Sequence, residues 1–292
     1  MLLRVPECIR DFSIKNFVPL FNLDAECRSW CIVMDILILK LVLAPLLIAT
    51  ATLAVRRWGF FAGGLFTGLP LTSGPVSLFL AIERGPRFAG QGSIGMLLGT
   101  VALVTFCVAY VRTARGQRWL PPMVIGFIAY CLAAWGLSFL SFSLEVVTVL
   151  VLLFLWVAVK LAGPPVTGPS QIASPSWDIP LRMVTATAMV LLITGSAGYL
   201  GPKWSGILAP FPAFTCIMAV FAQKQNGAAA VHGFMRGIII GCLGAVSFYF
   251  VVGFAIEHAG VAVAYLLATV ASVAVNGLCL GVLMLRPGFR PD

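Results

Sequence analysis

Charged side chains are scarce in this sequence: Asp, Glu, Lys and Arg together make up 10% of its 292 residues. Soluble globular domains carry about 25% charged residues, so this chain has too few charged side chains to cover a water-facing surface. Hydrophobic residues reach 60%, and the mean hydropathy is +1.03. They come in blocks of about 20, the length at which an α-helix crosses the hydrocarbon core of a bilayer. The sequence therefore predicts an all-α membrane protein that crosses the bilayer many times.

Acidic residues and histidines are missing from the places where ionic chemistry needs them. Glu83, Glu145 and Glu257 fall near the ends of apolar blocks, and His232 and His258 fall in or beside expected loops. A proton relay or a multivalent-cation site inside a membrane normally uses buried carboxylates. The eight cysteines form no CxxC pair, and no histidine stands at the spacing of metal ligands. We therefore expect neither a bound metal nor a disulfide framework, and no cofactor. No nucleophile with a neighbouring base is visible either, and a membrane enzyme ranks only third among the hypotheses.

The basic residues outnumber the acidic ones and give a formal net charge of +9. They stand singly or in pairs at the ends of apolar blocks, which is typical of residues that orient a membrane protein and not of a nucleic-acid-binding stripe. Without the four basic residues of the N-terminal 33 residues, nine spans would place eleven of them on one face and four on the other. The positive-inside rule then predicts a cytoplasmic C-terminus, and the apolar spans imply membrane lipids as partners. The larger set is Arg56, Arg57, Arg112, Arg115, Arg118, Lys160, Arg182, Lys224, Arg236, Arg286 and Arg290, and the smaller set is Lys40, Arg84, Arg87 and Lys203.

Short polar stretches divide the apolar part of the chain into nine expected spans. Residues 1–33 stand apart and lack the apolar core of a signal peptide, so we expect either a short interfacial or disordered tail or a true start at Met34. The expected spans are 36–55, 60–82, 94–113, 121–139, 143–162, 180–200, 204–223, 235–256 and 261–285. The expected organisation is the tail at 1–33, a four-helix repeat at 34–142, a linker helix with a Pro-, Gly- and Ser-rich loop at 143–179, and a second four-helix repeat at 180–292.

An offset of 142 residues aligns the first part of the chain with the second, without gaps, from about residue 38 to 108. Leu and Val match easily in an apolar sequence, but glycines and prolines do not. The helix at 143–162 has no counterpart, and one unpaired helix between two four-helix units turns the second unit upside down. Such inverted repeats, in secondary transporters, place the substrate site near the bilayer midplane. The matched pairs include Gly64 with Gly206, Pro70 with Pro212, Gly85 with Gly227, Gly95 with Gly237, and Gly99 with Gly241.

The strongest candidate site is a pair of proline-containing interruptions near the middle of the second and seventh spans, at 68–75 and 209–215. Proline lacks a backbone donor and clashes with the preceding turn, so these prolines should break or kink each helix. Paired interruptions in two halves point to a transporter binding site. The alternative is a pair of structural kinks that allow close helix packing, with the hydroxyls bonded to their own helices. The candidate substrate-binding residues are Thr67, Gly68, Pro70, Thr72, Ser73, Pro210, Pro212 and Thr215.

Glycines repeat at helical spacing in the third and eighth spans, at Gly95 and Gly99 and at Gly237 and Gly241. Small residues at this spacing let helix backbones approach closely inside a bilayer. We interpret these stripes as internal packing surfaces, and a homo-oligomer interface is the alternative.

The stretch Gly-Ile-Leu-Ala-Pro-Phe-Pro-Ala-Phe at 206–214 resembles a motif of the GlpM-type family of small bacterial membrane proteins, which carry Gly-Leu-x-Pro-x-Phe-Pro-x-Phe in one of four helices. In the first half the stretch has drifted to Gly-Leu-Phe-Thr-Gly-Leu-Pro at 64–70 and has lost its first proline. The resemblance implies a fused, inverted duplication of such a unit. The biochemical role of that family is not well defined, so the resemblance bears on architecture and not on activity.

Two hypotheses about function follow from these observations. The first is a secondary transporter of a small neutral, amphipathic or anionic solute in a bacterial cytoplasmic (inner) membrane, which works by alternating access between the two repeats. The second is a non-transporting membrane protein that scaffolds an envelope or polysaccharide assembly. A stoichiometric partner and the absence of any stabilising ligand would favour the second hypothesis.

Overall fold

The computed structural model describes residues 65, 68–71, 73–116, 118–163 and 178–284, and two isolated positions nearer the N-terminus. Contacts divide the chain into two compact units, Met1–Val42 and Leu43–Asp292, and everything described below belongs to the second. The expected tail, nearly all of the expected first span, and most of the linker between the fifth and sixth spans lie outside the described residues.

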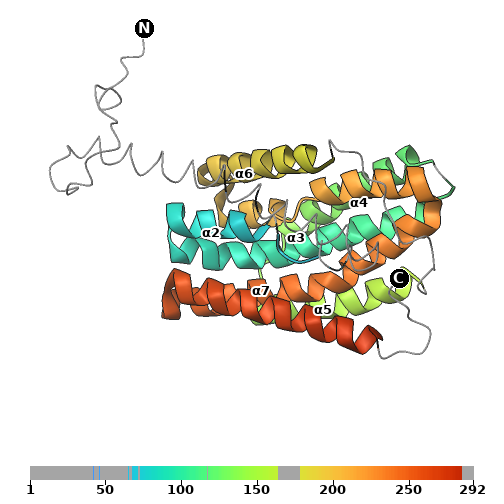
Figure 1. The fold of residues 1–292 in the computed structure, drawn as a ribbon. Coiled ribbons are helices and arrows are strands. Elements are labelled where there is room, and N and C mark those ends of the chain that lie inside the picture. Colours follow the sequence, from blue (N-terminus) through green and yellow to red (C-terminus); the bar gives the residue numbers. More distant parts are fainter. Residues whose placement is uncertain are drawn as a thin grey trace, which may run out of the picture. The chain divides into compact units, whose positions relative to one another are not determined.

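Every element in the described part of the chain is a helix (Figure 1). Four helical stretches there are long and apolar enough to cross a membrane, at Pro86–Thr113, Leu120–Ser138, Leu144–Leu161 and Asn226–Val282. The all-α prediction is confirmed for the described residues. The elements are α2 (Ser73–Arg84), α3 (Pro86–Thr113), α4 (Leu120–Ser138), α5 (Leu144–Leu161), α6 (Asp178–Leu208) and α7 (Ala213–Met284).

Glycines with positive φ reverse the chain between helical segments. The φ angle is 71° at Gly201, 79° at Gly227 and 79° at Gly260, a region that favours glycine because it has no Cβ. Accordingly α6 consists of segments 178–200 and 202–208, and α7 consists of segments 213–226, 228–259 and 261–284.

The core is formed by α3 and segment 228–259 of α7, which pack against each other in opposite directions. Gly90 lies beside Ile256 and Ser93 beside Gly253, so residue numbers rise along one helix as they fall along the other. Figure 1 shows the same antiparallel course. Large side chains of both helices are fully buried, among them Met96, Phe106, Phe234 and Tyr249.

Helices α4 and α5 lie at the periphery and expose most of their apolar side chains. Only 28% of the most apolar stretch of α4 and 22% of that of α5 is buried, compared with 61% for α3. Phe139 is 67% exposed and Trp156 is 65% exposed. Such surfaces suit a lipid environment, because hydrocarbon tails replace the protein core as the apolar partner.

The helix bounds agree with the sequence prediction at some positions and differ at others. Helices α4 and α5 match the expected spans within one residue at each end, with the expected tight hairpin between them. By contrast, α3 begins at Pro86 and not at 94, and the helix expected at 235–256 occupies 228–259, so that His232 lies inside a helix. Both extensions are rich in Gly, Ala and polar residues, whose low hydropathy suggested a loop. Packing against neighbouring helices keeps them helical, as the burial of Ala89 and Val231 shows.

Candidate functional site

Both proline-containing stretches interrupt their helices, as the sequence predicted. Residues Gly68–Leu71 form turns and bends before α2 starts at Ser73, and Ala209–Pro212 separate α6 from α7. We call these stretches the first break (68–71) and the second break (209–212).

The two breaks share one pattern of backbone hydrogen bonds. In the first break the Leu71 N–H donates to the Leu69 carbonyl at 2.7 Å and the Gly74 N–H donates to the Pro70 carbonyl at 2.7 Å. At positions 142 residues further on, the Ala213 N–H donates to the Phe211 carbonyl at 2.8 Å and the Cys216 N–H donates to the Pro212 carbonyl at 2.8 Å. The turns at the far ends of the two following segments also correspond. Gly85 has φ 93° and ψ 164°, and its aligned partner Gly227 has φ 79° and ψ −169°.

Each break lies level with the middle of a long core helix. A Cβ on Gly68 would come within 2.6 Å of backbone atoms of Gly241, near the centre of segment 228–259. A Cβ on Gly99, near the centre of α3, would collide with the backbone of Ile207, just before the second break. These contacts confirm that Gly99 and Gly241 serve close helix packing. They also place both breaks about halfway through the bundle.

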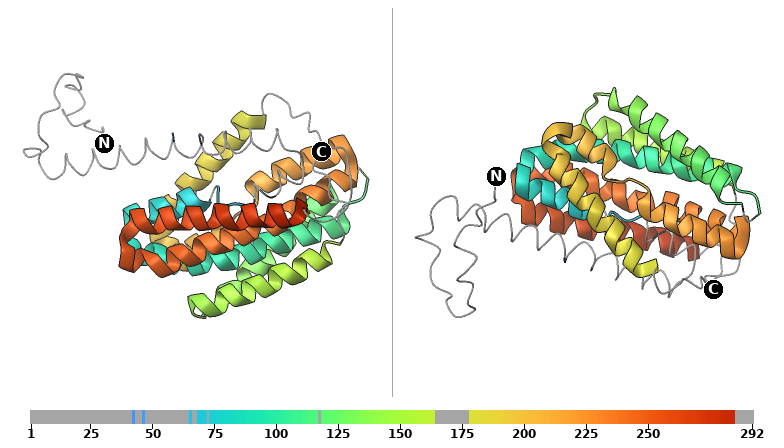
Figure 2. Two further views of the ribbon diagram at one scale, coloured as in Figure 1. Left: turned by 60° about the horizontal axis from the view of Figure 1, so that its bottom comes forward. Right: turned by 90° about the horizontal axis from the view of Figure 1, so that it is seen from above.

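The interrupted helices approach the middle from opposite ends. Segment 202–208 runs alongside α3 in the same direction, because Pro202 lies beside Gly92 and Ile207 beside Gly99. The first break and α2 run alongside segment 228–259, because Leu65 lies beside Gly241 and Ser73 bonds Tyr249. Since α3 and segment 228–259 are antiparallel, the two interrupted helices are antiparallel too. All views in Figures 1 and 2 show α2 and segment 213–226 leaving the middle toward opposite ends.

Hydroxyl groups and aromatic rings surround the breaks. The Ser73 and Tyr249 hydroxyls are hydrogen-bonded, and one turn further along α2 the Ser77 and Tyr265 hydroxyls are 2.6 Å apart. At the second break, the ring of Phe211 packs against those of two α4 residues, with ring centres 5.7 Å from Phe127 and 5.5 Å from Tyr130. The hydroxyl of Tyr130 donates to the Ile207 carbonyl at 3.4 Å.

The predicted site residues fall into two groups, one at each break. Gly68, Pro70 and Ser73 belong to the first group, and Ser73 is only 3% exposed. In the second group Pro210 and Pro212 are buried and Thr215 is 3% exposed. Thr67 and Thr72 lie outside the described residues.

Three buried polar groups near the breaks were missed by sequence reasoning. The Oγ atoms of Ser205 and Ser272 and the Oδ1 atom of Asn276 are buried without a hydrogen-bond partner in the protein. The Asn276 Nδ2 atom donates to the Gly241 carbonyl at 3.3 Å, so this side chain lies next to the first break. A buried polar atom without a partner costs about 1–3 kcal/mol, so a hydrogen bond from a polar guest or water at any of these atoms would be stabilising. Asn276 could have been found, because amides are uncommon in an apolar block.

The electrostatic character of the interior is neutral. Every buried polar side chain among the described residues is a Ser, Thr, Gln or Asn, besides the tyrosines. No group of three or more His, Cys, Asp or Glu side chains in the described part is placed to hold a metal ion. A ligand at the breaks could therefore contact hydroxyl groups, amides, backbone groups of the broken helices, and aromatic faces.

No protein-family model, curated protein or solved structure matches this chain. The resemblance of residues 206–214 to the GlpM-type motif therefore stays a prediction. In its described part, the protein is therefore an all-helical one. It has apolar helices of membrane-crossing length and two matched helix breaks deep in its bundle.

Proposed function

We propose that this protein is a secondary transporter of a small neutral, amphipathic or anionic solute, built from two inverted four-helix repeats with nine spans in all. The observation that carries the proposal is the pair of matched breaks. Each break lies level with the middle of a core helix, and the two core helices run in opposite directions. Broken helices that meet the bilayer midplane at a repeat interface are the usual setting of substrate sites in secondary transporters.

The relation between the halves is supported by contacts that exchange under the 142-residue offset. Gly99 packs on Ile207, and the aligned pair is Gly241 packed on Leu65. Matched backbone hydrogen bonds at the breaks and matched glycine conformations at the following turns support the same relation. An ordinary pair of kinks would not require any of these correspondences.

The orientation in the membrane follows from the charges at the two ends of the bundle. One end, where α3 and α5 finish and α4 begins, carries six basic side chains and no acidic one among those described; we call it the basic end. The opposite end mixes both signs, with Glu83, Arg87, Glu145 and Glu257 exposed there. The positive-inside rule places the basic end in the cytoplasm of a bacterial cell. The basic end is defined by Arg112, Arg115, Arg118, Lys160, Lys224 and Arg236.

The class of solute follows from the chemistry of the breaks. Helices α2 and α7 both begin there, and a helix N-terminus carries a partial positive charge that favours anionic or strongly dipolar groups. Buried hydroxyls and the Asn276 amide offer hydrogen bonds, with no carboxylate among the buried described residues to attract a cation. Because no described residue of either break is exposed, the structure corresponds in this proposal to an occluded state of the alternating-access cycle.

A cysteine-labelling experiment tests the inversion directly. Arg87 and Ala229 occupy aligned positions two residues after the turns at Gly85 and Gly227, so we expect Arg87→Cys and Ala229→Cys to react from opposite sides of the membrane. Each would be made in a cysteine-free background and probed with an impermeant maleimide in intact spheroplasts and in inverted vesicles. Arg115→Cys at the basic end is the control and should behave like Ala229→Cys. Labelling of both aligned positions from one side would remove the basis of the proposal.

A thermal-shift screen on the purified protein tests ligand binding. A solute that binds the folded state stabilises it by mass action, so at least one neutral or anionic compound should raise Tm in a concentration-dependent way. We expect Ser73→Ala and Thr215→Ala to reduce that shift, while Ser196→Ala should leave it unchanged because that hydroxyl bonds its own helix in α6. A shift insensitive to both site variants would place the ligand elsewhere. A stoichiometric protein partner with no stabilising solute would favour the scaffolding role.

A further inference from the structure

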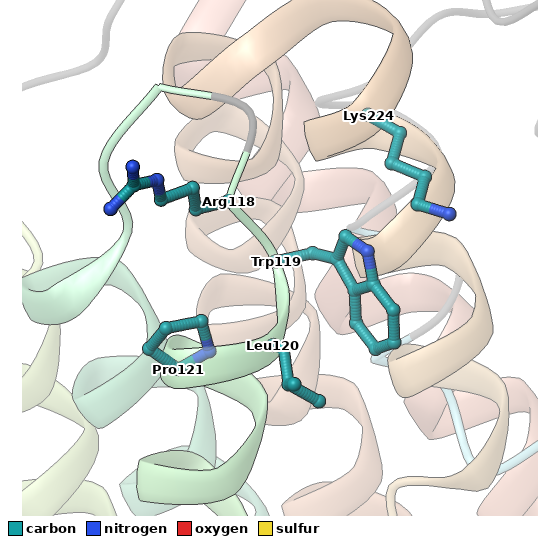
Figure 3. Close-up of a pocket in the computed structure, with 5 residues that line it drawn as sticks. All are labelled: Arg118, Trp119, Leu120, Pro121 and Lys224. Atoms are coloured by element: carbon teal, nitrogen blue, oxygen red, sulfur yellow. The ribbon is translucent and has the colours of Figure 1, made fainter.

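The basic end contains an open pocket that the transport proposal does not use. It has a volume of about 460 Å³ and is lined by Arg118, Trp119, Leu120, Pro121 and Lys224 (Figure 3). It lies where the loop after α3 enters α4, beside segment 213–226 of α7. Figure 3 shows the Trp119 indole next to Lys224, the Arg118 guanidinium directed away from the indole, and Leu120 below it. We propose that this pocket binds the headgroup of an anionic phospholipid in the cytoplasmic leaflet.

The pocket is held in shape by contacts between the loop and α7. The Gln223 Nε2 atom donates to the Arg118 carbonyl at 3.0 Å, and the Tyr110 hydroxyl donates to Gln223 Oε1 at 2.8 Å. The Lys224 Nζ atom lies 5.1 Å from the centre of the Trp119 ring. Buried Tyr110 and Gln223 therefore fix the backbone that carries Arg118, and the indole positions Lys224.

Both charged side chains that line the pocket are cationic, which favours an anionic ligand. Arg118 and Lys224 are both exposed, and the described side chains of the basic end include no carboxylate that would compete for them. Basic pockets between helices on the cytoplasmic side are suited to anionic headgroups, and Trp is enriched at the same depth, the membrane–water interface. The pocket is open to the surface and not enclosed in the bundle, which suits a headgroup that stays in contact with water.

An apolar stripe on α4 continues from the pocket and distinguishes a lipid from a free phosphate. The stripe is Leu120, Val124, Ile128 and Leu132, which are between 49% and 63% exposed and follow one another at four-residue spacing. At 1.5 Å per residue it extends about 18 Å, which is comparable with one leaflet of a hydrocarbon core about 30 Å thick. A lipid whose headgroup occupies the pocket can therefore lay an acyl chain along the stripe.

Native mass spectrometry of the detergent-solubilised full-length protein tests this proposal. Phosphatidylglycerol is expected to bind saturably and about tenfold more tightly than phosphatidylcholine, because two cations near the membrane surface favour an anionic headgroup. Arg118→Gln and Lys224→Gln should each reduce this preference and together abolish it. Arg115→Gln, which removes an exposed charge from the same end without touching the pocket, should preserve it.

Several outcomes would overturn the proposal. Equal affinities for the two lipids in the unchanged protein would do so without any variant, and so would an equal loss of preference in Arg115→Gln. Inorganic phosphate or a short-chain phosphatidylglycerol that binds as tightly as the long-chain lipid would also do so, because it would show a site for a soluble anion that does not use the stripe. None of these results bears on the transport proposal, which rests on the breaks.

Discussion

Replacing Gly99 or Gly241 by Ala is expected to destabilise the folded protein by about 1–3 kcal/mol each, the usual cost of forcing extra atoms into a packed interior. At Gly99 the new Cβ would meet the backbone of Ile207, and at Gly241 it would meet the backbone of Leu65. Backbone atoms cannot move aside as the end of a flexible side chain can, so each break would have to shift away from its core helix. Equilibrium unfolding in detergent, followed by the loss of helical signal with rising SDS, measures the change.

Gly136 provides the matched control, because it lies inside α4 and a Cβ at this position would have nothing within 4 Å of it. Alanine has a higher helix propensity than glycine, so Gly136→Ala should be neutral or stabilising by up to about 1 kcal/mol. If Gly99→Ala and Gly241→Ala unfold at the same SDS concentration as Gly136→Ala, the close approach of the breaks to the core helices is wrong.

Joint replacement of Pro70 and Pro212 by Ala is expected to abolish transport while the protein still inserts and folds. Alanine restores the missing N–H donor and removes the ring that clashes with the preceding turn, so each helix can continue through its break. The backbone groups that the breaks expose to a solute would then be bonded within the helices. Uptake into proteoliposomes of a compound identified by thermal shift measures the effect, and that compound should also cease to raise Tm.

Pro121→Ala is the control for general effects of losing a proline. Pro121 lies in the first turn of α4, where the backbone N–H that proline lacks would have no partner within the helix and the ring is well tolerated. Uptake should therefore be unchanged in Pro121→Ala. Normal uptake in the Pro70→Ala, Pro212→Ala double variant would show that the breaks do not form the transport site.

The sequence predicted the breaks because their cause is local. Proline cannot continue a helix whatever surrounds it, and the matched Pro70 and Pro212 marked both positions before any fold was known. Hydropathy likewise predicted α4 and α5 closely, because their apolar blocks end at short polar turns. Where hydropathy was weak, as at the starts of α3 and of segment 228–259, the prediction began the helix too late, since the stabilisation of those first turns comes from packing.

The partners of the breaks could not be predicted in the same way. Nothing local indicates that Tyr249 would bond Ser73, or that Ser205, Ser272 and Asn276 would be buried with polar atoms left unpaired. These relations join residues far apart in the chain, and they depend on which faces of the helices meet. The loop-to-helix contacts that shape the pocket at Arg118 and Lys224 are of the same kind.

Composition and pattern alone thus determined a helical, apolar chain with two proline-interrupted helices and glycine stripes, because each of these properties depends on residues within a few turns of one another. Only the tertiary structure decided that the breaks lie halfway along antiparallel core helices, and that Gly99 and Gly241 receive the backbone of the opposite half. Helix packing is set by contacts between distant segments. The sequence pattern shows that a helix face can pack closely, but it does not show which helix packs against it.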